Sequence, residues 1–313
     1  MPIARKSFIV LLFSLSIALV LAGCLSKPNT APPSEKLKVV ASVYPVYEFA
    51  RQVGGEKVEL TMLVPPGAEP HDWEPTAREI IQIKSAKLFL YHGAGLENLG
   101  KVLTQDTLGA TRAVAVSQGL TVLEEADEDE HGHDQHSGEH GDSHMWLDPV
   151  YAQQEVAAIA NALAEADPAN ADYYRQNADR YTQELSRLDQ EYRAALSGLP
   201  RREIVVSHAA FGYLAARYNL TQRSIMGLAP DSEPTPDKMA QVVAFCREHN
   251  VKYIFFETLV NPKLSQTVAR ETGASLLVLN PIENLTQEEV NQGKNYLSLM
   301  RDNLANLKTA LSE

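Results

Sequence analysis

Short apolar runs alternate with amphipathic stretches through most of the chain. In the first half the runs with strand character cover residues 37–43, 58–64, 87–91 and 112–116. After residue 200 the alternation returns with residues 203–206, 253–256 and 275–279, and with a weaker run near 222–226. Strands that alternate with helical patterns are typical of parallel sheets covered by helices. The pattern therefore predicts an α/β fold of two lobes, each with a mostly parallel sheet flanked by helices.

Signals for helix starts lie between these runs. Thr76 and Glu79 form a capping-box pattern, which predicts that a helix begins there. Other helices are expected over about residues 46–53, near residues 96–103, and from the N-cap residues Thr235, Asn261 and Thr286.

A long helical region, residues 150–199, separates the two halves and is broken at Asp167-Pro168. From about residue 169 to residue 196 it carries large apolar side chains at spacings of three and four. Such a stripe belongs to an amphipathic helix, here roughly 40 Å long at a rise of 1.5 Å per residue. A helix of that length can join both lobes as one rigid backbone helix, although an ordinary surface helix would have a similar sequence.

The first residues have the pattern of an export signal. Arg5 and Lys6 precede an uncharged apolar run over residues 7–23, the layout of a secretory signal. The run ends in Leu21-Ala22-Gly23-Cys24, which resembles a bacterial lipobox and implies a lipid on Cys24 after cleavage. An ordinary signal or a membrane anchor with a coincidental cysteine is the alternative.

The chain is accordingly divided into five segments. Residues 1–23 are expected to be a signal peptide, 24–36 a lipidated N-terminus and tether, 37–166 an N-terminal metal-binding lobe, 167–199 a linking helix, and 200–313 a C-terminal metal-binding lobe. No stretch after the leader approaches the roughly 18–20 apolar residues of a membrane span.

Charge and cysteine content narrow the classes of partner. The formal charge of −12 becomes −14 without the leader and its two cations, and nine acidic residues lie within residues 124–142, which contain no Lys or Arg. This distribution argues against nucleic acid as a partner. If Cys24 carries a lipid, Cys246 is the only thiol left, so no intramolecular disulfide can form.

Histidines and carboxylates crowd together in residues 124–149, which hold ten carboxylates and five imidazoles. This mixture suits divalent cations of the zinc type. Composition alone does not distinguish a structural site, a mobile scavenging loop and a solvated polar tract over residues 124–143. The histidines expected to form an accessory metal loop are His131, His133, His136 and His140. His144 differs because it abuts the apolar Met145-Trp146-Leu147, where the chain becomes ordered.

Two further histidines lie at the ends of predicted strands. His71 follows the second strand of the first half, and His208 ends the first strand of the second half. Both therefore lie at the carboxyl edge of a sheet, where open α/β folds bind their ligands. A single histidine there is more often structural, but two of them together with His144 predict a metal site. Zinc takes three or four nitrogen and oxygen ligands in roughly tetrahedral array.

Two carboxylates lie at the same edge. Glu257 follows the strand 253–256 and is expected to accept a hydrogen bond from a ligand or to cap a helix, although direct binding of the ion is also open. Glu283 lies in a loop four residues beyond Leu279, where exposed glutamates are usually just solvated.

Four segments occur in a characteristic order: Pro70-His71-Asp72-Trp73-Glu74-Pro75, the His-rich tract running into His144, Ser207-His208-Ala209-Ala210-Phe211-Gly212-Tyr213, and Phe256-Glu257. In this combination the chain resembles the zinc/manganese-type metal solute-binding lipoproteins of bacterial ABC transporters, over nearly all of its mature length. The resemblance implies two lobes joined by one long rigid helix, with a metal ion in the cleft. It implies His71, His144 and His208 as ligands and, by register, Glu283 as the fourth, with Asn280 or water as the alternative.

The resemblance also implies the ion and the task. Manganese-type members have a glutamate where this chain has His208, and three imidazoles with one carboxylate favour Zn²⁺. The implied protein is extracytoplasmic, monomeric and anchored to the membrane by its lipid. It captures Zn²⁺ in the cleft and delivers it to an ABC transporter permease without enzymatic activity, and its site survives removal of residues 128–141.

Three alternatives stay open at this point. One is a protein for manganese or another divalent metal, and a second is a surface adhesin, which the lipid anchor would permit. The third is a zinc hydrolase, which would keep water in the fourth position and use Glu257 as general base. The chain has no HExxH pattern and no nucleophile elbow, and a fourth carboxylate ligand would close the open position that a hydrolase needs.

Overall fold

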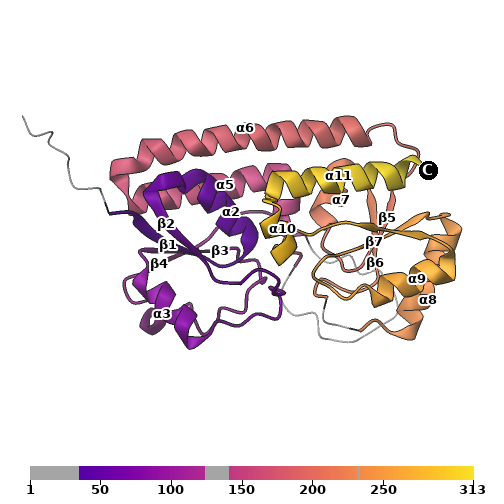
Figure 1. Cartoon of the computed structure of the whole chain (residues 1–313), viewed down its shortest axis with the longest axis horizontal. Helices are drawn as coiled ribbons and strands as arrows, with labels where there is room; N and C mark the ends of the chain where they lie inside the picture. Colours follow the sequence, from indigo (N-terminus) through magenta and orange to yellow (C-terminus); the bar gives the residue numbers. More distant parts are fainter. Residues whose placement is uncertain (1–34, 124–140, 231–232) are drawn as a thin grey trace, which may run out of the picture. The chain divides into compact units, whose positions relative to one another are not determined.

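Each half of the chain is built on a four-stranded parallel sheet (Figure 1). The computed structural model describes residues 35–123, 141–230 and 233–313. The first sheet has the order β2-β1-β3-β4, with β1 (Leu37–Ala41), β2 (Val58–Met62), β3 (Leu88–Tyr91) and β4 (Arg112–Ala115). The second has the order β6-β5-β7-β8, with β5 (Glu203–Val206), β6 (Thr221–Ser224), β7 (Tyr253–Phe256) and β8 (Ser275–Val278). The predicted two-lobed α/β fold is confirmed.

Several predicted features lie outside the described residues. They are the signal peptide, the lipidated Cys24, and the loop histidines His131, His133, His136 and His140. Residues 37–313 group as one compact unit, and the expected boundaries between lobes and linking helix stay predictions. None of the helices in the described ranges combines the length and the hydropathy that crossing a bilayer requires.

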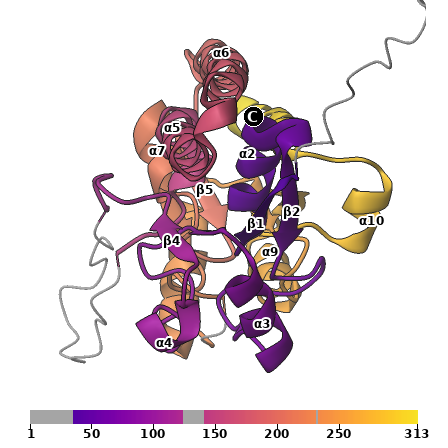
Figure 2. The ribbon, with the colours of Figure 1, turned by 90° about the vertical axis from the view of Figure 1, so that its left-hand side faces the viewer.

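Helices lie on both sides of the sheets (Figures 1 and 2). The longer ones are α2 (Tyr44–Gly54), α3 (Ala77–Ser85), α5 (Pro149–Ala166), α6 (Ala171–Leu196), α8 (Pro236–Glu248), α9 (Lys263–Thr272) and α11 (Tyr296–Ser312). The shorter ones are α4 (Gln105–Leu108), α7 (Gly212–Tyr218) and α10 (Gln287–Asn291). Reciprocal capping boxes at Thr76 and Thr286 start α3 and α10, as predicted. The pattern of the sequence did not predict α7 or α11.

The prediction of a helix near residues 96–103 is wrong. This stretch forms turns, and α4 begins only at Gln105, after an N-cap at Thr104. The reason is Glu97, whose carboxylate turns back to accept hydrogen bonds from the amide of His92 (2.6 Å) and from the next amide (2.9 Å). The backbone therefore wraps around this side chain instead of winding into a helix.

The helix α6 runs alongside both sheets (Figure 1). Its 26 residues span about 39 Å at a rise of 1.5 Å per residue. In its first half Tyr181 packs on Phe49 of α2, with ring centroids 5.9 Å apart. Toward its end Tyr192 stacks on Tyr218 of α7 at 4.9 Å. One continuous helix therefore contacts both lobes, as the sequence predicted.

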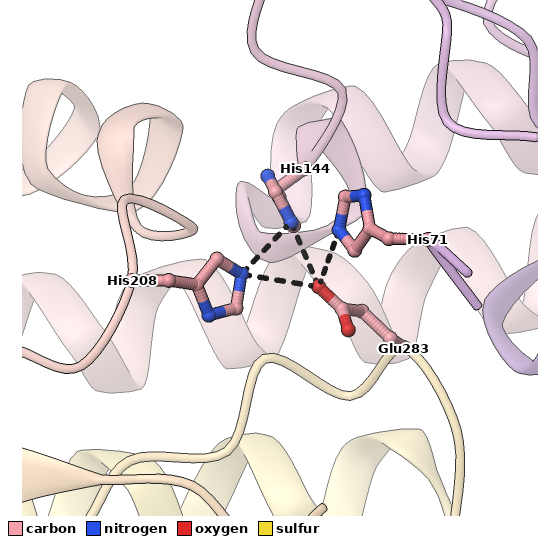
Figure 3. Close-up of side chains that lie close together, drawn as sticks. All are labelled: His71, His144, His208 and Glu283. Carbon is pink, nitrogen blue, oxygen red and sulfur yellow. Dashed lines mark hydrogen bonds and ion pairs between the residues drawn. The ribbon is translucent and has the colours of Figure 1, made fainter. Parts of the chain in front are cut away.

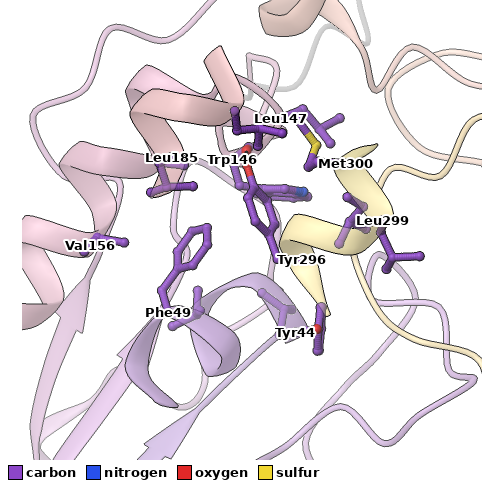
Figure 4. Close-up of a cluster of buried hydrophobic side chains, with 14 of the residues drawn as sticks. Tyr44, Phe49, Trp146, Leu147, Val156, Leu185, Tyr296, Leu299 and Met300 are labelled. Carbon is purple, nitrogen blue, oxygen red and sulfur yellow. Dashed lines mark hydrogen bonds between the residues drawn. The ribbon is translucent and has the colours of Figure 1, made fainter. Parts of the chain in front are cut away.

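The two lobes also share a hydrophobic core (Figure 4). Tyr296, at the start of α11, lies edge to face with Phe49 of the first lobe, with ring centroids 5.0 Å apart. The Tyr296 hydroxyl donates to the Trp146 carbonyl, and Trp146 Nε1 donates to the Pro281 carbonyl at 2.8 Å. Tyr296 and Trp146 are fully buried. Hydrogen bonds inside an apolar core therefore hold the second lobe against the first.

Leu188→Ala tests the packing of α6. Leu188 is fully buried, so loss of its side chain should lower the free energy of unfolding by about 2–5 kcal/mol in urea denaturation. Arg187→Ala is the matched control, because that neighbouring side chain is 62% exposed and its ion pair with Glu184 lies at the surface. The control should change stability by less than about 1 kcal/mol. Equal losses in the two variants would contradict the packing described.

Candidate metal centre

Four side chains that lie far apart in the sequence meet between the lobes (Figure 3). Glu283 Oε1 lies 2.8 Å from His144 Nε2 and 3.3 Å from both His71 Nε2 and His208 Nε2. Each of the four offers a ligand atom that lies within 4.8 Å of all the others. Three imidazole nitrogens and one carboxylate oxygen in this arrangement are the donor set of a four-coordinate divalent cation.

The elements that carry these side chains explain why they converge. His71 lies in the connection from β2 to α3, while His208 and Glu283 follow β5 and β8. His144 directly precedes the 3₁₀ turn Met145–Leu147, which is buried and leads into α5. Because parallel strands end at one edge of their sheet, both lobes present such connections to the same cleft.

The centre is closed on most sides. His144 and His208 are fully buried and Glu283 is 1% exposed, whereas the His71 side chain is 12% exposed. His71 also lines a cavity of about 650 Å³, together with residues 94–100, Gly141, Ser143 and residues 228–229. The cavity therefore adjoins the centre on the side of its partly exposed histidine.

Two of the imidazoles are oriented by carboxylates on their other nitrogen. His144 Nδ1 lies 2.8 Å from Asp142 Oδ1, and His208 Nδ1 lies 2.8 Å from Glu257 Oε1. Such partners fix the ring and its tautomer, so that Nε2 faces the ion as a donor, and they make the imidazole more basic. Glu257 therefore lies where a hydrogen-bond partner of a ligand was expected, while the sequence did not single out Asp142 among the nine acidic residues of its tract.

Asp142 is itself held by both lobes. Its amide donates to the Leu123 carbonyl at 2.9 Å, and its carbonyl accepts from the Tyr213 hydroxyl at 2.8 Å. A Cβ on Gly212 would lie 2.5 Å from Asp142 Oδ2, so a side chain at this position would displace the Asp142 carboxylate. The segment Phe211-Gly212-Tyr213 thus positions His144 through Asp142, a role that its sequence does not reveal.

Asn280 does not join the cluster. Its Nδ2 donates to Glu289 Oε1 (2.9 Å) and to Thr258 Oγ1 (3.3 Å), and its Oδ1 accepts from the Ile282 amide (2.7 Å). These bonds shape the loop that ends at Glu283. Ile282 has a φ of +60°, a left-handed conformation that costs an ordinary residue roughly 1–2 kcal/mol. Contacts around the loop must therefore maintain it.

The charges of the metal-free centre balance one another. Burial lowers the pKa of His144, but hydrogen bonds and charges from Asp142 and Glu283 outweigh it and raise the pKa to about 9. Burial likewise opposes charge on His208, and Glu257 and Glu283 hold its pKa well above the usual range. For Glu283, burial raises the pKa, yet hydrogen bonds from the three imidazoles keep it well below the ordinary value. A cation that enters must displace protons from the imidazoles.

Glu69 is a further carboxylate beside the centre that the sequence did not point to. Its Oε1 accepts a hydrogen bond from the His71 amide at 3.2 Å. Burial, followed by the charge of Glu283, raises its pKa to about 8. Near neutral pH the metal-free protein therefore keeps Glu69 protonated, and Glu283 carries the negative charge.

Comparison with known proteins gives one consistent result. The family described as zinc-uptake complex component A, periplasmic, matches residues 39–310. The high-affinity zinc uptake system protein ZnuA of Bacillus subtilis strain 168 is 38% identical over 301 residues, 94% of each chain. The zinc-binding lipoprotein AdcA of Streptococcus pneumoniae serotype 4 is 35% identical over 309 residues, 97% of this chain and 60% of AdcA.

Solved structures agree with this family. The crystal structure of the Zn(II)-bound ZnuA-like domain of Streptococcus pneumoniae AdcA is similar with a TM-score of 0.76 and 34% identity. The similarity covers 89% of this chain and 100% of that domain.

The charge balance predicts how the stability of the metal-free protein depends on pH. The pKa of His144 in the folded protein, about 9, exceeds the value of about 6.5 for an unfolded histidine. Its stabilising contribution is therefore complete below about pH 6.5 and is lost as the pH rises to about 9. The unfolding temperature, measured with a chelator present, should fall over this interval. Asp142→Asn should flatten the fall, and an unchanged slope in that variant would contradict the assignment.

Proposed function

Because this chain belongs to the family of zinc-uptake complex component A, we propose that it binds one Zn²⁺ ion between its lobes and delivers the ion to the permease of an ABC transporter. The observation that carries the proposal is the buried cluster of His71, His144, His208 and Glu283. Two of these side chains come from each lobe, so the ion is bound where the lobes meet.

The donor set favours zinc over manganese. Zn²⁺ binds imidazole nitrogen readily and usually has four ligands, whereas Mn²⁺ prefers oxygen donors. His144 and His208 are each paired with a carboxylate on Nδ1, which strengthens Nε2 as a donor. The cluster offers these two nitrogens, a third from His71 and one carboxylate oxygen, a donor set that suits zinc.

The same geometry argues against a hydrolase. A catalytic zinc keeps one position open for water, but Glu283 already supplies the fourth ligand. Glu257, the expected general base, accepts hydrogen bonds from the Ser207 hydroxyl and from His208 Nδ1. It is therefore engaged in holding a ligand. The family description names zinc uptake, which supports a role in metal uptake.

We extend the proposal to the parts of the chain beyond the described residues. The family is described as periplasmic and the pneumococcal relative is named a lipoprotein, which supports an extracytoplasmic protein with a lipid on Cys24. In this proposal the protein acts as a monomer. In this proposal the loop histidines His131, His133, His136 and His140 raise the local zinc concentration.

His208→Ala tests the ligand assignment. Zinc affinity, measured by competition with a chromophoric chelator, should fall more than about a hundredfold, beyond the loss caused by changing only a ligand's hydrogen-bond partner. His249→Ala is the matched control. His249 is also a histidine of the second lobe and faces a carboxylate, Glu203 at 3.9 Å, but its side chain is 37% exposed and does not belong to the cluster. It should bind zinc as the unmodified protein does.

Deletion of residues 128–141 completes this test. The deleted protein should still bind one zinc tightly, and loss of that ion would show that the loop, and not the four-residue cluster, holds it.

The choice of ion can be measured directly. Dialysis of the purified protein against equimolar Zn²⁺ and Mn²⁺, followed by elemental analysis, should return zinc in excess because three imidazoles outweigh one carboxylate. His208→Glu changes the donor set to two nitrogens and two carboxylates and should raise the manganese fraction. A manganese-loaded unmodified protein would overturn the zinc assignment.

A further inference from the structure

Asn284, the residue after Glu283, joins the two lobes through its side chain. It is fully buried. Its Nδ2 belongs to the second lobe and donates to two carbonyls of the first, Pro65 O at 2.7 Å and Ala68 O at 3.0 Å. Its Oδ1 accepts from the Leu285 amide at 2.9 Å. Both donor hydrogens and the oxygen of this amide are thus satisfied in one conformation only.

Backbone hydrogen bonds extend the same contact. The Gly67 amide donates to the Leu285 carbonyl at 2.8 Å, and the Tyr44 amide donates to the Glu283 carbonyl at 3.3 Å. Gly67 has a φ of +86° with open space where a Cβ would be, so glycine is needed for the turn itself. Residues 283–285 are therefore docked on residues 65–68, and this turn leads within three residues to His71.

We propose that Asn284 is a positioning residue, an inter-lobe latch that keeps His71 and Glu283 on the same ion and thereby sets the rate of metal release. The latch consists of the two Asn284 bonds to Pro65 and Ala68 and the bond between Gly67 and Leu285. This inference rests on the proposed function, because it concerns release of the ion from that centre.

The other two ligands do not depend on the latch. His144 and His208 are held by Asp142 and Glu257, and both are fully buried. Opening of the latch separates the loops of His71 and Glu283 and leaves the ion with two imidazoles. The positive φ of Ile282, next to Glu283, shows that this loop needs its neighbours to stay in place.

The surroundings leave room for such an opening. A cavity of about 440 Å³ adjoins the latch and is lined by Tyr44, Pro66 and Leu285 among others. It lies beside residues of both docked segments, so the segments can part there without first displacing a packed core.

The experiment measures zinc release from the full chain. Zinc-loaded Asn284→Ala is mixed with excess EDTA in a stopped-flow instrument, and release should be about tenfold faster or more than in the unmodified protein, because two buried carbonyls lose their donor. The association rate should change by less than about threefold, since His144 and His208 still form the initial binding site. Asn177→Ala is the matched control: Asn177, on α6, is 5% exposed and donates to the Val53 carbonyl of the first lobe at 2.8 Å, away from residues 283–285. Its release rate should match that of the unmodified protein.

The latch is overturned if Asn284→Ala releases zinc at the rate of the unmodified protein. It is also overturned if Asn177→Ala releases zinc as fast as Asn284→Ala does. Hydrogen exchange of the unmodified protein, followed by NMR, gives a second measurement in case the variant does not fold. The Gly67 amide donates to the Leu285 carbonyl and the Tyr44 amide donates to the Glu283 carbonyl, so both lose their acceptor when residues 283–285 separate from the first lobe. Zinc should therefore raise the protection factors of these two amides by the same factor. Protection factors of these two amides that respond unequally to zinc overturn the inference. Failure of the unmodified protein to bind zinc overturns the proposed function instead, whereas binding with unchanged release overturns the latch alone.

Discussion

The carboxylate of Glu283 is buried at the junction of the two lobes, and it is stable there because three imidazoles face it. An unpaired charge in the interior is strongly disfavoured, so the group needs His71, His144 and His208, or a cation in their place. Each of these partners stands at the end of a different connection from the sheets. The electrostatic requirement of this one residue therefore constrains how the two lobes are arranged, because its partners come from both of them.

The frame around this junction leaves little freedom to the lobes. The helix α6 packs on both of them, and Tyr296 of the second lobe is inserted between Phe49 and Trp146 of the first. Separating the lobes as rigid bodies would expose this apolar core and break hydrogen bonds inside it, which costs much more than rearranging a connection. Movement that accompanies loading is consequently expected in the connections that carry ligands rather than at the core.

Much of this arrangement follows from local sequence, and some of it does not. Alternation of apolar runs was enough to predict the strands, and the rule that ligands gather at the carboxyl edge brought His71 and His208 together. The prediction was wrong over residues 96–103, where apolar spacing indicated a helix. In the structure the Glu97 carboxylate instead folds back and accepts a hydrogen bond from the amide of His92. Asn284 was not predicted because its partners lie in the other lobe, far away in the sequence. Asp142 was not predicted because it is one of nine acidic residues in its tract, and composition does not show which of them contacts His144.

The two pairs of proposed ligands are fixed in different ways, and this asymmetry bears on the conflict between holding an ion and releasing it. A site with four stiff ligands binds tightly but releases slowly, whereas four loose ligands bind weakly. Here His144 and His208 are each bound to a carboxylate close by, while His71 and Glu283 lie on connections that Asn284 ties to each other. A transporter that pulls on either connection weakens two ligands at once. Because loss of two of four donors lowers affinity far more than proportionally, a small local displacement suffices for release, and the rigid frame of α6 need not bend.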